Sequence, residues 1–247
     1  MSSHDSSPAL LVTGAGRNVG AALVDAFLDD ERPVIGQYRT HTDAVDRLAE
    51  RGARMLAGDF SSEAGIFDFI ERLEAPDPAL CGIIHNASAF TPTAAEPHDA
   101  ARQFQDFFAV HMLAPYLITR SLRHRLHGPS GAPADIIHIT DIYSDNPSPA
   151  HDIYCATKAG LQNLALSFAR SLAPAVKVNV IQPGPIHFPT GYSEADSQAV
   201  LKTTPLGRPG GAAAIVQAVR SILANDFMTG AVIAVDGGRR LGQGGAE

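Results

Sequence analysis

Short apolar runs alternate with longer amphipathic stretches along the whole chain. The runs are rich in Ala, Val, Leu and Ile and predict seven strands, at residues 9–13, 33–38, 54–57, 80–85, 135–140, 176–181 and 231–235. The stretches between them repeat apolar residues at helical spacing and predict helices at about 18–30, 42–51, 62–74, 98–127, 151–173 and 210–224. Because strands and helices alternate, we expect an α/β fold in which helices cover both faces of a doubly wound parallel sheet.

A single domain over residues 1–247 is the expectation, because no linker divides the chain. The Pro/Gly/Ala-rich stretch 128–134 is too short to separate domains, and 45% apolar residues suffice for one substantial core. The segment 186–204, which includes Pro189, Gly191 and Tyr192, is expected to form a mobile substrate lid, since long functional loops of this kind are common near active sites.

Composition and charge favour small-molecule chemistry. The net charge is −7 and no Lys/Arg cluster appears, so the electrostatic footprint of a nucleic-acid-binding protein is missing. No run approaches the roughly 18 apolar residues of a membrane span, and the polar residues 1–8 do not resemble a signal peptide, which favours the cytoplasm. Cys81, Cys155 and the histidines follow no metal-ligand spacing, so no metal is assigned.

A glycine-rich turn follows the first predicted strand and opens the first predicted helix. Its backbone N–H groups and the helix N-terminus can face a pyrophosphate. Glycines also serve ordinary turns, and in isolation the two interpretations would be about equally good. The position in the first strand–helix unit favours nucleotide binding. The cofactor-binding residues expected here are Gly14, Gly16, Arg17, Asn18, Val19 and Gly20.

Arg39 and Thr40 end the second predicted strand, where an NAD-specific site would place an Asp or Glu about 20 residues beyond the glycines. No acid stands there. A guanidinium can bind phosphate bidentately and a hydroxyl can add a further bond, so the 2′-phosphate of NADPH is preferred. Asp59-Phe60 and Asn86-Ala87-Ser88 follow the next two strands and are either walls of the adenine and ribose site or plain strand-end turns.

Tyr154 and Lys158 stand four residues apart, and Asp141 precedes the tyrosine by thirteen residues. Four residues make about one helical turn, so the phenol and the ammonium share one face of a helix. A neighbouring cation favours the phenolate relative to the reference pKa of about 10, so this tyrosine can act as an acid near neutral pH. Together with the glycine-rich turn, the pattern predicts nicotinamide-dependent reduction of a carbonyl or an imine.

Several motifs, in this order, resemble the short-chain dehydrogenase/reductase family over nearly the whole chain. They are Thr13-Gly14…Gly20, Asn86-Ala87, Tyr154-x-x-x-Lys158, Asn179, Pro183-Gly184 and Asp236-Gly237-Gly238. The resemblance implies a Rossmann-type fold, with Tyr154 as the proton donor and Lys158 lowering its pKa and binding the nicotinamide ribose. It places the loop at Pro183 and Gly184, with Ile186, beside the nicotinamide. It also implies a homotetramer, with the helices at 98–127 and 151–173 in one interface and the C-terminal end in another.

Two positions depart from the common pattern of that family. Most members have Ser where this chain has Asp141, and Asn where it has His111, four residues before Pro115. Pteridine reductases, one branch of the family, share the Asp and combine an Asn-Ala-Ser turn with a Phe that stacks on the pterin, here Phe90. Asn18 stands where that branch often carries Arg. Segments such as Tyr38-Arg-Thr-His41 look like bacterial members that reduce dihydromonapterin.

The chemistry of pterin reduction gives Asp141 a role. Reducing the N5=C6 bond needs a hydride at carbon and a proton at nitrogen, and a carboxylic acid beside Tyr154 can supply or relay that proton. This hypothesis requires a raised pKa for Asp141, which burial would raise and Lys158 would lower. Phe90 is expected to stack on the substrate, with Ser88 and Tyr192 as further substrate contacts.

We therefore predict NADPH-dependent reduction of a dihydropterin to the tetrahydro form, with dihydromonapterin, dihydrofolate and dihydrobiopterin as candidates. Two alternatives stay open. A ketone reductase, for example of a 3-oxoacyl thioester, would normally keep Ser in place of Asp141. A catalytically silent, NADPH-sensing protein would not need both Tyr154 and Lys158.

Overall fold

One parallel sheet runs through the computed structural model, which describes residues 7–74, 79–188 and 191–242. Its strand order is β3-β2-β1-β4-β5-β6-β7, which confirms the predicted doubly wound, Rossmann-type sheet. The strands are β1 (Ala9–Val12), β2 (Val34–Tyr38), β3 (Arg54–Ala57), β4 (Leu80–His85), β5 (Ala134–Ile139), β6 (Val176–Pro183) and β7 (Val232–Val235).

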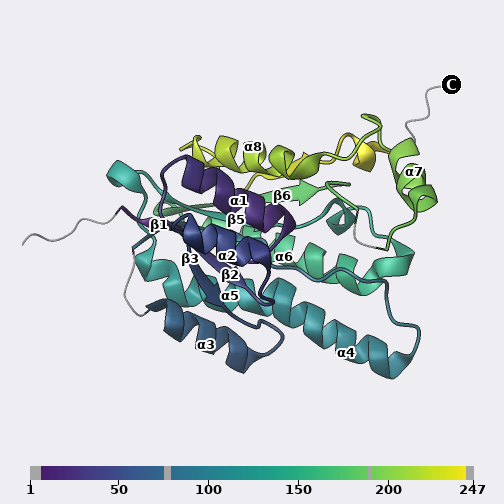
Figure 1. The fold of residues 1–247 in the computed structure, drawn as a ribbon, viewed down its shortest axis with the longest axis horizontal. Coiled ribbons are helices and arrows are strands. Elements are labelled where there is room, and N and C mark those ends of the chain that lie inside the picture. Colours follow the sequence, from purple (N-terminus) through teal and green to yellow (C-terminus); the bar gives the residue numbers. More distant parts are fainter. Residues whose placement is uncertain (1–6, 75–78, 189–190, 243–247) are drawn as a thin grey trace, which may run out of the picture.

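Helices cover both faces of this sheet and form a three-layered molecule (Figure 1). One face is covered by α1 (Asn18–Asp29), α2 (Asp43–Glu50) and α8 (Gly211–Leu223). The other is covered by α3 (Glu63–Glu74), α5 (Ala114–Leu122) and α6 (Asp152–Ser171), and α4 (Pro97–Phe108) packs against α6. Within the described ranges, no helix has the length and apolar character needed to span a membrane.

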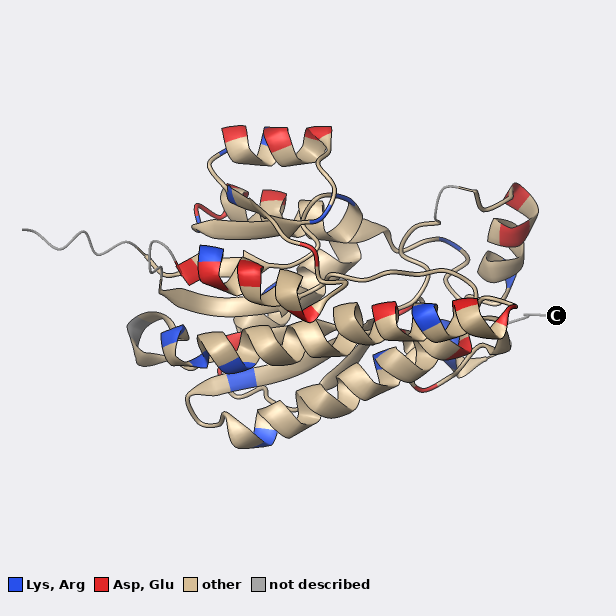
Figure 2. Cartoon of the chain, turned by 90° about the horizontal axis from the view of Figure 1, so that it is seen from below, with Lys and Arg blue, Asp and Glu red and all other residues tan. Residues whose placement is uncertain are grey.

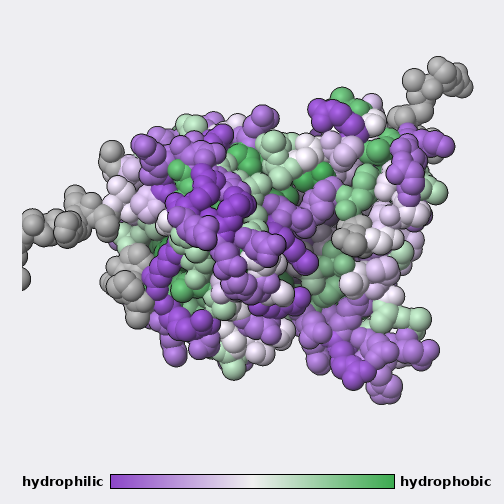
Figure 3. Space-filling view, in the orientation of Figure 1, coloured by the Kyte–Doolittle hydropathy of each residue, from purple (hydrophilic) through white to green (hydrophobic). Residues whose placement is uncertain are grey.

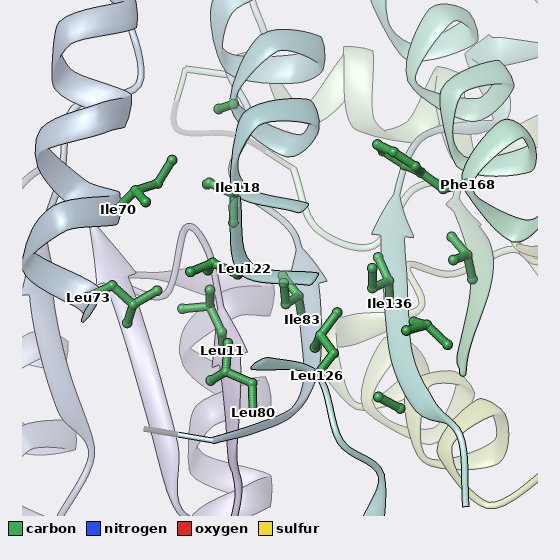
Figure 4. Close-up of a cluster of buried hydrophobic side chains, with 14 of the residues drawn as sticks. Leu11, Ile70, Leu73, Leu80, Ile83, Ile118, Leu122, Leu126, Ile136 and Phe168 are labelled. Atoms are coloured by element: carbon green, nitrogen blue, oxygen red, sulfur yellow. The ribbon is translucent and has the colours of Figure 1, made fainter. Parts of the chain in front are cut away.

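The two core layers divide the residues of each central strand between them. Leu11 is level with Ile35 and Ile83 on the neighbouring strands, and all three face α3, α5 and α6. Figure 4 shows this layer, in which Ile83 and Ile136 lie opposite Ile118 of α5 and Phe168 of α6. The alternate strand residues pack under α1 and α8 instead. Parallel strands are buried on both faces, which is why their sequences read as continuous apolar runs.

The helix predicted over residues 98–127 is interrupted, which corrects the expectation from periodicity. A π-helical turn, η1 (Ala109–Leu113), separates α4 from α5, and a 3-10 turn, η2 (Arg123–Arg125), follows Leu122. Pro115 has no N–H, and its ring excludes a regular bond to the carbonyl of His111 four residues earlier. The wider turn accommodates this defect. It also carries His111 into the interior.

The segment predicted as a lid, 186–204, contains a helix, α7 (Glu194–Lys202). Ser193 caps α7 in a capping box: its hydroxyl accepts the Asp196 N–H, and the Asp196 carboxylate accepts the Ser193 N–H. No residue of α7 is buried, so apolar periodicity could not identify this helix. Residues 189–190 of the segment, including Pro189, lie outside the described residues.

The winding of the chain reverses between β1 and β4. These strands are neighbours in the sheet, but the chain leaves β1 into α1 on one face and β4 into α4 and α5 on the other. In doubly wound sheets this switch point, at the carboxyl ends of the strands, is where ligands bind.

His85 and His138 form a buried pair on adjacent strands. Their rings stack with centroids 4.8 Å apart and planes inclined by 20°. Burial is the main cause that lowers the pKa of both rings, to about 3 for His138, whose pKa the charge of Lys158 lowers further. Both histidines are therefore neutral in the folded protein over the ordinary pH range.

This neutrality makes stability depend on pH. A group with a depressed folded pKa stabilises above its unfolded pKa, about 6.5 for histidine, and loses that contribution as pH falls. Relative to His138→Leu, we expect wild type to lose about 1 kcal/mol of unfolding free energy between pH 7 and pH 5.5. Denaturant unfolding at the two pH values measures this. His124→Leu, at an exposed site, should leave the pH dependence unchanged, and equal pH dependence in wild type and H138L would contradict the expectation.

Candidate active site

A cavity of about 680 Å³ opens at the carboxyl ends of the strands. In the space-filling view, hydrophobic residues gather in the hollow between α4 and α7 (Figure 3). Every residue that the sequence singled out as a cofactor, substrate or catalytic residue borders this cavity. They are Gly14, Gly16, Arg17, Asn18, Val19, Gly20, Arg39, Thr40, Asp59, Phe60, Asn86, Ala87, Ser88, Phe90, Asp141, Tyr154, Lys158, Pro183, Gly184, Ile186 and Tyr192.

The glycine-rich turn between β1 and α1 needs its glycines for two different reasons. Gly14 has φ of +68°, and a Cβ there would lie 2.8 Å from the Cα of Ala87. A Cβ at Gly20 would lie 2.0 Å from the carbonyl oxygen of Gly14. The turn therefore folds back tightly on α1 while it touches the loop after β4. Its backbone and the start of α1 are left open to a ligand.

Gln37 holds this turn in place, and sequence reasoning missed it. Its Oε1 accepts the Gly14 N–H at 2.8 Å, and its Nε2 donates to the Gly58 carbonyl at 2.7 Å. Gln37 is buried. Buried amide groups need hydrogen-bond partners, and these two bonds supply them. A polar residue inside an otherwise apolar strand was the available signal. Arg39 and Thr40 lie just beyond, exposed at the end of β2.

Asn86 connects the two turns, and its side-chain amide donates hydrogen bonds to the protein backbone. Thr13 Oγ1 accepts the N–H groups of both Asn86 and Ala87 at 3.0 Å. In return the Asn86 amide donates to the carbonyls of Thr13, at 3.0 Å, and Gly14, at 3.2 Å. These bonds hold the turns after β1 and β4 against each other.

Asp59 and Phe60 border the cavity in different ways. Asp59 is exposed and accepts the Ser61 N–H at 3.0 Å, which is a strand-end turn. Phe60 is buried, with its ring edge-on to Phe69 at 5.3 Å between centroids, so it belongs to the core as well as to the cavity border.

Tyr154, Lys158 and Asp141 converge at the inner end of the cavity. The Tyr154 hydroxyl donates to Asp141 Oδ2 at 2.9 Å, and the Lys158 ammonium lies 5.8 Å from the centre of the tyrosine ring. Lys158 donates to the Ile139 carbonyl at 2.9 Å and is almost completely buried. The Tyr143 N–H holds the other carboxylate oxygen of Asp141 at 2.9 Å.

Burial dominates the electrostatics of these three groups. It raises the pKa of Asp141, against the lowering effects of the Tyr143 and Tyr154 hydrogen bonds and of the Lys158 charge. Burial also lowers the pKa of Lys158 to about 8, which Asp141 partly opposes. The pKa of Tyr154 lies well above its usual range, because of burial first and Asp141 second. Burial and the charge of Asp141 thus move the pKa of Tyr154 in the direction opposite to the one expected from a neighbouring lysine alone.

Aromatic rings also line the cavity next to Tyr154. Phe90 stacks on His151, with centroids 4.6 Å apart and planes inclined by 8°, and meets the Tyr154 ring edge-on at 4.9 Å. Tyr192 lies 5.8 Å from Phe188 across the segment beyond β6. One face of Phe90 is thus covered by His151, which sequence reasoning missed. The position of His151, three residues before Tyr154, was the signal.

Arg239 is a further charged residue of the cavity that sequence reasoning missed. Its guanidinium donates to the Val200 carbonyl in the last turn of α7 at 2.7 Å. Its charge also contributes to lowering the pKa of Asp141. Arg239 thereby connects α7 to the segment after β7 and adds a positive charge to the cavity border. It directly follows the Asp236-Gly237-Gly238 motif, which could have drawn attention to it.

Comparison with known proteins agrees with this geometry. A family model described as enoyl-(acyl carrier protein) reductase matches residues 14–240. The dihydromonapterin reductase of Citrobacter koseri is 38% identical over 241 residues, covering 94% of this chain and 96% of that protein. The dihydromonapterin reductase of Klebsiella pneumoniae is 41% identical over 233 residues, with coverage of 94% and 96%.

Among solved structures, FolM alternative dihydrofolate reductase 1 from Brucella canis, complexed with NADP, has a TM-score of 0.86 at 24% identity and covers 98% of this chain and 97% of that chain. At this identity the likeness demonstrates a shared fold. Together with the family match and the two sequence relatives, the fold and site define an oxidoreductase. The chain belongs to the short-chain dehydrogenase/reductase family, whose members use nicotinamide cofactors.

Asp141→Asn tests the electrostatic arrangement of the site. The amide can still accept the Tyr154 hydroxyl proton but carries no charge, so it removes a cause that raises the pKa of Tyr154. We expect the pKa of Tyr154 to fall toward its usual value in this variant. Ultraviolet difference titration, with Tyr154→Phe in each background as the blank, isolates this phenol. If the Tyr154 pKa were the same in wild type and D141N, burial alone would control it.

Proposed function

We propose that this protein reduces a dihydropterin to its tetrahydro form with NADPH, and that dihydromonapterin is its substrate. The hydrogen bond between Tyr154 and the buried carboxyl of Asp141 carries this proposal. The two relatives named dihydromonapterin reductase support the choice of substrate, and the dihydrofolate reductase name of the Brucella canis protein supports dihydrofolate as a second one.

The residues at the switch point fit NADPH. The open turn at Gly14 and Gly16, in front of α1, suits a pyrophosphate, and a Cβ at Gly14 would meet Ala87. Arg39 and Thr40, exposed at the end of β2, suit a 2′-phosphate. NADPH bound there supplies the hydride for C6 of the pterin. Pro183, Gly184 and Ile186, with Lys158, line the deeper part of the same cavity and suit the nicotinamide half.

The protein's own groups position the substrate and hold the proton for N5. The raised pKa of Asp141 keeps a proton on the Asp141–Tyr154 pair at higher pH than an exposed carboxyl would, which suits a donor to nitrogen. Phe90, held by His151, offers a flat apolar surface to the pterin ring. Ser88 and Tyr192 are the further substrate contacts that we propose. The positive charge of Lys158 limits how far the pKa of Asp141 rises.

We further propose a cytoplasmic homotetramer. Residues 107–119 contain no Lys, Arg, Asp or Glu, and the helices α5 and α6 carry few charges (Figure 2). Phe104, Phe108 and Tyr116 are exposed on α4 and α5 and suit one interface. Phe227 is fully exposed beside β7, an edge strand that benefits from being covered, and suits the other. The unpaired Cys81 and Cys155 agree with a reducing compartment.

Substrate turnover tests the proposed reaction. NADPH oxidation is followed with dihydromonapterin, dihydrobiopterin, dihydrofolate, an acetoacetyl thioester and an enoyl thioester. We expect turnover of the pterins, and Tyr154→Phe to lower kcat by about 10²–10⁴-fold, as for loss of a proton donor. Tyr116→Phe, which keeps the aromatic ring proposed for the interface and lies outside the cavity, serves as the control. Turnover of a thioester alone would point to the ketone or enoyl reductase alternative, and NADPH binding without any turnover would point to a sensor.

Cofactor selectivity tests Arg39. Because only NADPH carries the 2′-phosphate, we expect Arg39→Ala to raise the KM for NADPH about tenfold or more, as for loss of a charge-assisted hydrogen bond. The KM for NADH should change little. Arg123→Ala, in the exposed turn η2, is the matched control. Equal changes for the two cofactors in R39A would remove Arg39 from phosphate recognition.

A further inference from the structure

His111 has partners for both of its ring nitrogens although it has no exposed surface. Its Nε2 accepts the backbone N–H of Ala89 at 3.1 Å and lies 3.1 Å from the Ser88 hydroxyl. Its Nδ1 lies 2.8 Å from the Thr157 hydroxyl on α6. The ring therefore spans the distance between the turn after β4 and the first turns of α6.

The available protons allow only one arrangement of this chain of hydrogen bonds. A backbone N–H always donates, so Nε2 of His111 must be unprotonated toward Ala89. The Thr157 hydroxyl donates its single proton to the Tyr154 carbonyl at 3.0 Å, so its oxygen accepts from Nδ1–H of His111. Burial and the charge of Lys158 hold the pKa of His111 well below its usual range, which keeps the ring neutral.

The two ends of this chain are the two groups that meet at the reacting end of the cavity. Ala89 directly precedes Phe90, and the Thr157 bond ends on the backbone of Tyr154. The His111 ring also meets the Tyr154 ring edge-on, at 5.5 Å between centroids. The Ser88 hydroxyl, which lies 3.1 Å from Nε2 of His111, contributes a hydrogen bond that lowers the pKa of Tyr154.

We propose that His111, as the neutral Nδ1–H tautomer, is a positioning residue that sets the separation between the substrate turn Ser88–Phe90 and the proton donor Tyr154. The proposal deepens the proposed pterin reduction and rests on it. His111 cannot touch the substrate, because it is completely buried. An asparagine at this position would be too short to reach both partners.

Two substitutions of His111 each keep the hydrogen bond of one ring nitrogen and remove that of the other. An asparagine amide lies where Nδ1 lies, so His111→Asn keeps the bond to Thr157 and loses those to Ala89 and Ser88. A glutamine amide lies where Nε2 lies, so His111→Gln keeps the grip on Ala89 and loses Thr157. We expect H111N to raise the pterin KM about tenfold with kcat little changed, and H111Q to lower kcat about tenfold with the pterin KM little changed.

Thr157→Val provides a second test that leaves the histidine in place. It removes the hydroxyl that joins Nδ1 to Tyr154 and preserves the shape of the side chain. We expect T157V to reproduce the kcat loss of H111Q. If H111N, H111Q and T157V all changed kcat and KM in the same proportion, His111 would be a packing residue without a positioning role. That result would overturn the proposal.

The tautomer can be read without any substrate. Nitrogen-15 NMR of histidine-labelled wild-type protein should give, for His111, a protonated Nδ1 and an unprotonated Nε2 throughout the pH range of activity. The resonances are assigned by their loss in H111N or by their displacement in T157V. A protonated Nε2, or a ring that is charged near neutral pH, would overturn the proposal.

The turnover assay and the NMR measurement distinguish a failure of this proposal from a failure of the function on which it rests. The Nδ1–H tautomer in a protein that turns over only a thioester would overturn pterin reduction and leave the hydrogen-bond chain standing. Pterin turnover with an Nε2–H tautomer would leave the function standing and overturn the chain.

Discussion

The close approach of the turns that follow β1 and β4 determines where everything else in the site lies. Parallel strands bring their carboxyl ends to one edge of the sheet, and the winding reverses between these two strands. Only glycine at position 14 lets the first turn rest against Ala87, and Thr13 and Asn86 close the contact with hydrogen bonds. The glycine turn then opens toward a dinucleotide on the α1 side. The β4 turn continues directly into Ser88 and Phe90, so the proposed cofactor and substrate regions both start from this one contact between the turns.

Burial decides the protonation of the groups at the inner end of the cavity. A serine at position 141, as most family members have, would leave Tyr154 beside Lys158 without an opposing charge. The carboxyl at this position accepts the tyrosine hydroxyl and contributes to raising the pKa of Tyr154, while burial raises its own pKa. The carboxyl of Asp141 therefore stays protonated to higher pH than an exposed carboxyl would. This exchange suits a reaction that protonates a nitrogen, because a carboxyl of raised pKa is a competent donor there.

Local signals in the sequence predicted the sheet and selected residues that the structure brings to one cavity. Apolar runs such as 80–85 identify strands because parallel strands are buried on both faces, and turn residues such as Gly14 follow directly after a strand. The helix α7 was missed because it buries nothing and has no apolar face. The break at η1 was missed because apolar periodicity continues through Pro115. Gln37, His151 and Arg239 contact residues far away in the chain, and no local pattern reports such contacts.

The departures at positions 111 and 141 belong together in physical terms. Asp141 reaches the hydroxyl of Tyr154 from the end of β5, whereas His111 reaches its ring edge and, through Thr157, its backbone from η1. The tyrosine is thus held from two sides. Pro115 contributes by widening the helix at η1, which carries the longer imidazole into the interior. A reducible ring that must be stacked and protonated at one atom needs its stacking surface and its proton donor at a fixed separation, and the imidazole spans that separation in one rigid unit.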